Sequence, residues 1–208
     1  MPDNTLKTPV CKRFLDILIS AVALIVLSPV FLVISTFIIL SSGLPVLFRQ
    51  KRPGKKGVPF TLLKFRSMRN PLSKQEGPDS DKERITKVGK FLRRSSLDEL
   101  PELINILKGE MSLVGPRPLL MQYLERYSPE QARRHDVLPG LTGWAQINGR
   151  NAISWEEKFH YDVWYVDNWS FWLDIKIILI TIWKAIKGQG ISQEGHATME
   201  EFMGSPKA

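Results

Sequence analysis

The sequence predicts a mostly helical α+β protein whose N-terminal part enters a membrane. Three observations predict this fold class: a largely apolar run over residues 14–40, two strand-like segments around a basic turn at residues 52–57, and apolar residues at helical spacing further along the chain. The 208 residues show no internal repeat. We therefore expect one domain over residues 1–208.

The apolar run is long enough to meet a membrane. At about 1.5 Å per residue, a helix over residues 14–40 exceeds the roughly 30 Å of a bilayer core. Ser28 and Pro29 lie near its centre, where proline removes a backbone hydrogen bond and predicts a kink. A kink alone does not distinguish a spanning helix from one that turns back.

Basic residues on both sides of the run favour the second arrangement, because such residues tend to stay in the cytoplasm. They are Lys7, Lys12 and Arg13 before the run and Arg49, Lys51, Arg52, Lys55 and Lys56 after it. We therefore expect a re-entrant helix-break-helix hairpin at residues 14–40, with its apex near Ser28 and Pro29. Residues 41–208 would then lie on the cytoplasmic face.

A basic segment follows the membrane run. Residues 46–48 and 59–65 predict a small β-hairpin, and residues 86–94 predict a short basic helix. Between Arg49 and Arg94 there are fifteen Lys or Arg against four Asp or Glu, in a chain of net charge +8. Nucleic acid, an anionic membrane surface or phosphorylated substrates would all suit this charge. The single Cys11 excludes an internal disulfide and gives no zinc spacing.

Two adjacent carboxylates, Asp98 and Glu99, open the next predicted helix, over residues 97–107. Ser96 and Glu99 match a capping box, and a helix N-terminus favours acidic side chains. Pro101 moves the expected cap toward Leu97 or Asp98, since proline is tolerated only in the first turn. Capping is the favoured interpretation of this stretch alone, although the basic residues before it make a place where a metal ion and a phosphate could meet the two carboxylates.

Two loops rich in glycine and proline follow, and each contains an arginine. In Gly-Pro-Arg-Pro at residues 115–118, the prolines restrict Arg117 and present its guanidinium for phosphate binding. Residues 139–151 contain Arg150. Ser154 and Glu157 predict a capped helix. Charged residues within 171–184 favour an interfacial or core-packing amphipathic helix over a second span, and five of the six tryptophans lie between positions 155 and 183.

Taken in order, these motifs resemble the bacterial sugar transferases called monotopic phosphoglycosyl transferases. The resemblance rests on the apolar run, Lys-Phe-Arg-Ser-Met at 64–68, Ser-Leu-Asp-Glu-Leu-Pro at 96–101, Gly-Pro-Arg-Pro at 115–118 and Pro-Gly-Leu-Thr-Gly at 139–143. It covers essentially the whole chain. Residues 135–137, 148–155 and 190–200 are similar to the PglC type.

The resemblance implies a reaction and its residues. Asp98 would be the nucleophile that attacks the β-phosphate of a UDP-sugar, releases UMP and forms a phosphosugar-aspartyl intermediate, which undecaprenyl phosphate then attacks. Asp98 and Glu99 would hold Mg²⁺. Phosphate or nucleotide contacts would come from Lys64, Arg66, Arg93, Arg117 and Arg150. Asp162 and Asp174 would be structural, and His135, His160 and His196 form no ligand constellation.

The PglC likeness further implies UDP-N,N'-diacetylbacillosamine as donor, in the first membrane step of N-glycan assembly at the cytoplasmic face of the bacterial inner membrane. UDP-galactose, UDP-glucose or a UDP-N-acetylhexosamine, for capsule or O-antigen, are the alternatives within this class. The implied partners are the UDP-sugar, undecaprenyl phosphate and membrane lipids, without nucleic acid. From a different class, a membrane-tethered basic binding protein would explain the charge and would tolerate Asp98→Asn.

Overall fold

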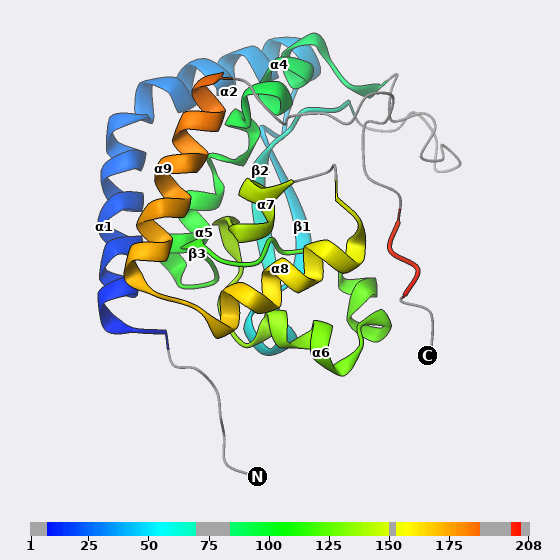
Figure 1. Cartoon of the computed structure of the whole chain (residues 1–208). Coiled ribbons are helices and arrows are strands. Elements are labelled where there is room, and N and C mark those ends of the chain that lie inside the picture. Colours follow the sequence, from blue (N-terminus) through cyan, green and yellow to red (C-terminus); the bar gives the residue numbers. More distant parts are fainter. Residues whose placement is uncertain (1–7, 70–83, 150–152, 188–200, 205–208) are drawn as a thin grey trace.

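The computed structural model describes residues 8–69, 84–149, 153–187 and 201–204 (Figure 1). Helices make up most of it, with two small sheets, so the predicted mostly helical α+β class is confirmed.

The N-terminal apolar run forms two helices, α1 (Val10–Val26) and α2 (Ser28–Ser42), which meet at an angle of 62°. Pro29 lies in the first turn of α2, where its missing N–H is not needed. The break therefore falls where Ser28 and Pro29 predicted it. Within the described residues, neither helix is long and apolar enough to cross a bilayer alone, whereas the bent pair meets that requirement in length and composition.

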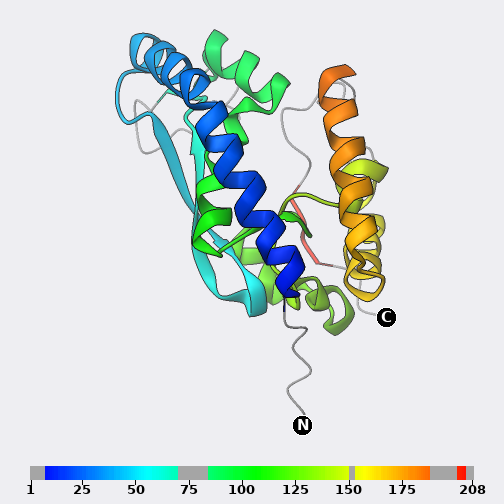
Figure 2. The same cartoon turned by 90° about the vertical axis from the view of Figure 1, so that its left-hand side faces the viewer.

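One face of α1 is polar and packs inside the protein. Lys12, Asp16 and Ser20 are buried, and the helix lies beside α5 and β3 (Figure 2). The other face of α1 and most of α2 expose apolar side chains. These are Phe14, Ile17, Leu18, Val22, Ile25 and Val26 in α1, and Val30, Leu32, Val33, Phe37, Ile39 and Leu40 in α2.

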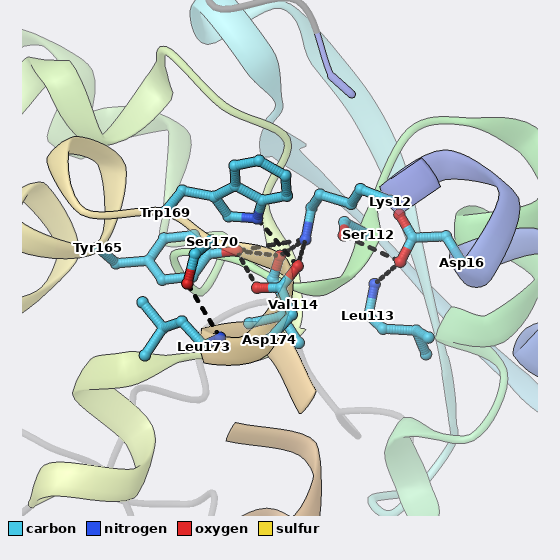
Figure 3. Close-up of polar contacts among 10 residues, drawn as sticks. All are labelled: Lys12, Asp16, Ser112, Leu113, Val114, Tyr165, Trp169, Ser170, Leu173 and Asp174. Carbon is cyan, nitrogen blue, oxygen red and sulfur yellow. Dashed lines mark hydrogen bonds and ion pairs between the residues drawn. The ribbon is translucent and has the colours of Figure 1, made fainter. Parts of the chain in front are cut away.

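A buried polar cluster fastens α1 to the rest of the chain (Figure 3). The Lys12 ammonium donates to Asp174 Oδ2 at 2.6 Å, to the Val114 carbonyl at 2.9 Å and to the Tyr165 hydroxyl at 3.2 Å. Asp16 Oδ1 accepts from the Leu113 amide at 2.9 Å. The structural role expected for Asp174 is confirmed, and Lys12, a predicted membrane flank, proves to be an internal cation.

The predicted β-hairpin is confirmed and is longer than expected. Strands β1 (Leu47–Pro53) and β2 (Pro59–Phe65) pair antiparallel across a 3₁₀ turn at Lys55–Gly57. The sequence predicted only residues 46–48 for the first strand, because the following residues are mostly charged. Those side chains are exposed or half-buried, so their charges do not prevent the backbone from pairing. The pairing keeps one register along the strand, with Phe48 opposite Lys64 and Arg52 opposite Phe60.

The helix predicted over residues 97–107 is interrupted. The chain forms α4 (Lys87–Ser95), a 3₁₀ turn at Leu97–Glu99 and then α5 (Glu102–Lys108). Pro101 is the N-cap of α5, because it has no N–H to continue a helix from residue 97. The predicted capping box is wrong: Ser96 has φ 56°, ends α4 and makes no side-chain cap bond to the turn.

A short parallel sheet organises the second half. Strand β3 (Ser112–Val114) pairs with β4 (Gly140–Thr142). The segment between the two strands contains α6 (Pro129–Ala132) and the 3₁₀ turns Met121–Arg126 and Arg133–His135. The backbones of Gly115 and Gly140 approach so closely that a Cβ on Gly140 would lie 2.1 Å from the Gly115 nitrogen. Glycine is therefore required at that crossing.

Helices α7 (Trp144–Asn148), α8 (Trp155–Asp167) and α9 (Phe171–Lys187) complete the fold. The capping box of Ser154 and Glu157 opens α8 as predicted. Ile177 of α9 is fully buried, so α9 packs on the core, while Trp172 and Trp183 are exposed. The core includes Phe60, Leu62, Leu103, Ile106, Met111, Leu113, Val114, Ile147, Tyr165 and Ile177.

Candidate active site

The two predicted catalytic carboxylates lie in the 3₁₀ turn between α4 and α5. The left-handed conformation of Ser96 ends α4, and the turn closes with the Glu99 amide donating to the Ser96 carbonyl at 3.2 Å. Both side chains are half-buried. The turn is packed against β2, which brings Lys64 to the carboxylates, and the loop after β3 brings Arg117.

Glu99 is held between two cations. Lys64 Nζ donates to Glu99 Oε1 at 2.8 Å, and the Arg117 guanidinium donates to both oxygens, at 3.4 Å to Oε2 and through a shorter bond to Oε1. Burial alone would raise the pKa of Glu99, but the charges and hydrogen bonds of Arg117 and Lys64 outweigh it and hold the pKa well below its usual range. Glu99 is therefore a fixed anion that orients two basic side chains.

Asp98 has a different environment. No hydrogen bond or ion pair with its carboxylate occurs among the residues that the structure describes. Burial and the neighbouring Glu99 raise the pKa of Asp98, although Lys64, Arg117 and Arg93 counteract this effect. Among the described residues, the Asp98 oxygens thus have no bonded partner, and they lie within the field of three cations, which suits a nucleophile that approaches a phosphate.

Glu102 is a third carboxylate at the site, and the sequence analysis did not single it out. Its side chain is buried, and Lys64 Nζ lies 3.1 Å from its Oε1. Burial and the charge of Glu99 raise the pKa of Glu102 to about 7. The three-residue spacing from Glu99 was the available signal, since it places both side chains on one side of a helical turn. Lys64 is therefore shared by Glu99 and Glu102.

The other predicted basic residues take different positions. Arg93 Nε donates to Ser67 Oγ at 2.8 Å, and the Arg93 charge lowers the pKa of Asp98, so this side chain belongs to the site. Arg66 binds the backbone carbonyls that follow α2, including that of Leu44 at 3.1 Å, and is not brought to the carboxylates. Arg150 lies outside the described residues.

A buried ion pair supports the backbone of Arg117. Arg134 Nη2 donates to the Arg117 carbonyl at 2.8 Å, and Nη2 and Nε donate to Asp162 Oδ2 at 2.7 and 3.0 Å. The structural role expected for Asp162 is confirmed. Arg134 was missed, because nothing in its local sequence points to a partner 28 residues away. The fully buried Arg134 guanidinium holds the loop that brings Arg117 to Glu99.

The donor set fits a magnesium ion in part. Across the described ranges, no group of three or more His, Cys, Asp or Glu side chains is placed to hold a metal. Mg²⁺ is commonly bound by one or two carboxylates together with water and substrate phosphates, however. The unengaged Asp98 suits such a site, whereas both oxygens of Glu99 already accept from Lys64 and Arg117.

Comparison with known proteins identifies relatives over most of the chain. A family model described as bacterial sugar transferase matches residues 7–188. An uncharacterized sugar transferase of Bacillus subtilis, EpsL, is 53% identical over 196 residues, which cover 94% of this chain and 97% of that protein. A UDP-glucose:undecaprenyl-phosphate glucose-1-phosphate transferase of Klebsiella pneumoniae is 45% identical over 84% of this chain and 40% of its own length. The galactosyl transferase CpsE of Streptococcus agalactiae is 42% identical over 87% of this chain and 43% of its own.

Proposed function

Because the chain belongs to the bacterial sugar transferase family, we propose that it transfers a sugar 1-phosphate from a UDP-sugar to undecaprenyl phosphate and releases UMP. The observation that carries this proposal is the division of roles between two adjacent carboxylates. Glu99 is held by Lys64 and Arg117, while Asp98 accepts no bond from the described part of the chain and lies in the field of the same cations. The family match favours this enzyme over a basic binding protein, which would not need such an arrangement.

In the proposed first step, an Asp98 oxygen forms a bond to the β-phosphorus of the UDP-sugar. The bond between that phosphorus and the bridging oxygen breaks, and UMP leaves. In the second step, a phosphate oxygen of undecaprenyl phosphate attacks the same phosphorus and releases Asp98, which yields the lipid diphosphosugar. Arg93, Arg117 and Lys64 supply positive charge for the phosphates.

Magnesium remains part of the proposal. Asp98 would hold the ion together with the donor phosphates, and the ion would reduce the repulsion between the carboxylate and the diphosphate. Glu99 stays a predicted ligand, which would require it to exchange a bond with Lys64 or Arg117. Arg66 and Arg150 likewise stay predicted substrate contacts.

For the donor, we propose UDP-glucose or UDP-galactose as the first sugars to test, since relatives that share over 40% identity are named for glucose and galactose. The prediction of UDP-N,N'-diacetylbacillosamine as donor depends mainly on residues 190–200, which lie outside the described residues. That donor stays a prediction, together with the UDP-N-acetylhexosamines. A panel of these donors, scored by UMP release, separates the alternatives.

We also propose that α1 and α2 enter one leaflet of the bacterial inner membrane and return to the cytoplasmic face. The 62° bend and the exposed apolar side chains of both helices support this. Cysteines introduced at Thr8 and Ser42, with Cys11 replaced by serine, should be labelled from the same side of the membrane. Labelling from opposite sides would show that the pair spans it.

The decisive experiment measures nucleotide release in detergent with Mg²⁺, undecaprenyl phosphate and each UDP-sugar, and it resolves UMP from UDP. Wild type should release UMP, and Asp98→Asn should release none, because the amide is not a nucleophile. Release of UDP would indicate ordinary glycosyl transfer and would refute the mechanism.

A further inference from the structure

A cavity of about 320 Å³ lies directly beside Glu99. One wall is a single face of α9, formed by residues 178, 181, 182 and 185 at helical spacing. The lining also contains Leu100, Leu113 and Leu141, together with Ser95 and Ser96 at the end of α4. The cavity therefore connects the catalytic turn with the last turns of α9.

Most polar groups around the cavity are satisfied within the protein. Thr142 and Thr181 share a hydrogen bond of 2.7 Å, Thr181 also donates to the Ile177 carbonyl, and Lys184 donates to the Ile147 carbonyl at 2.5 Å. Gln146 Nε2 donates to the Leu141 carbonyl, while Gln146 Oε1 is a buried acceptor that has no partner among the residues with described positions. The walls thus offer much apolar surface and few open hydrogen-bonding groups, which disfavours a hydroxyl-rich ligand.

The apolar surface continues to the outside of the molecule along α9. Ile182 lines the cavity and is 51% exposed, and its neighbour Trp183 is 50% exposed. An apolar chain that enters beside Ile182 would end at Glu99, next to Asp98. The charged end of such a molecule would then meet Lys64, Arg93 and Arg117. The positive charges of these three side chains already act on the Asp98 carboxylate.

We propose that this cavity holds the isoprene units of the acceptor lipid that lie nearest its phosphate. The inference rests on the proposed function and assigns the acceptor's place in that site. A volume near the lower end of the roughly 300–1,000 Å³ typical of ligand pockets admits only the start of the chain, so the rest stays in the bilayer. The competing occupant is the uracil of the donor, which would use Gln146 Oε1.

Variants that fill the cavity show whether it serves UMP release or the transfer to undecaprenyl phosphate. Ala185 lines the cavity from an exposed position, so Ala185→Leu and Ala185→Trp fill it in two steps with little effect on the core. Leu179→Trp is the matched control, because Leu179 is 62% exposed on the same helix and lies outside the cavity lining. Each variant is tested for the UMP burst without acceptor, for transfer to undecaprenyl phosphate and for transfer to dimethylallyl phosphate.

We expect wild-type bursts in all variants and a kcat/KM for undecaprenyl phosphate that falls about tenfold or more in Ala185→Trp, less in Ala185→Leu and not in Leu179→Trp. Dimethylallyl phosphate, with one isoprene unit, should be affected much less. Unchanged transfer to undecaprenyl phosphate in Ala185→Trp overturns the inference. So does a diminished burst in a variant with wild-type thermal stability, which would assign the cavity to the nucleotide. A wild type that releases no UMP from any donor instead refutes the proposed function itself.

Discussion

Replacement of Lys12 by methionine tests how strongly the buried polar cluster holds α1. The substitution keeps the length of the side chain but removes three hydrogen bonds, to Asp174, the Val114 carbonyl and the Tyr165 hydroxyl. It leaves the Asp174 carboxylate buried without its cation. Removal of one partner of a buried pair costs about 3–5 kcal/mol.

The remaining contacts place the effect at the lower end of that range. Asp174 keeps bonds from the Tyr165 hydroxyl at 2.7 Å and from Trp169 Nε1 at 3.0 Å. We therefore expect Lys12→Met to destabilise the protein by about 3 kcal/mol, which corresponds to a fall in Tm of roughly 6–12 °C at this chain length.

Thermal unfolding in detergent micelles measures this effect. Lys90→Met is the control, because Lys90 is exposed on α4, and it should change stability by less than about 0.5 kcal/mol. The double variant Lys12→Met with Asp174→Leu should recover part of the loss, since neither charge is then left unpaired. A Tm for Lys12→Met equal to that of Lys90→Met would refute this account of the cluster.

Four further predictions concern the site, its supports and the aromatic cluster around Phe202. The pKa of Asp98 is raised above the value of about 3.9 that an unperturbed aspartate has. When the pH is lowered, the UMP burst should therefore be lost at a pH above that value. Lys64→Met removes a charge that lowers this pKa and should move the acid limb of the pH profile further upward; a downward shift would contradict the assignment. Arg134→Lys keeps the charge but loses the planar fork, so we expect a loss of about 1–3 kcal/mol in urea unfolding and a raised KM for the UDP-sugar, whereas an unchanged KM would separate Arg134 from Arg117. Phe202→Ala removes one ring from a buried aromatic cluster with Tyr123 and Phe159, so it should lower the free energy of unfolding by about 3–5 kcal/mol. Met203→Ala is the control and should have little effect, because Met203 is exposed.

Features with local causes could be predicted from the sequence. The helix break needs only Pro29, the capping box of α8 needs only Ser154 and Glu157, and the β-hairpin needs two apolar segments and a turn. The adjacent carboxylates and the arginine between two prolines were found as motifs. Each of these signals lies within a few residues of the structure that it specifies.

Features that depend on distant partners could not be predicted in this way. Arg134 supports Arg117, and Lys12 pairs with Asp174, only because the fold brings these segments together. The helix expected from residue 97 also failed for a physical reason. The apolar spacing continues through Pro101, but that residue has no N–H, so the Leu100 amide bonds back to Leu97 and a new helix begins.

The pairing of Lys12 with Asp174 has a consequence for the order of folding. The two residues are 162 positions apart, so the ribosome makes α1 long before it makes α9. Closure of so long a loop is unfavourable until the segments between have condensed. We therefore expect the bond between Lys12 and Asp174 to form late in folding. A nascent chain that stops before Asp174 carries α1 with a Lys12 ammonium that lacks the Asp174 carboxylate, and α1 completes these contacts only after α9 has been made.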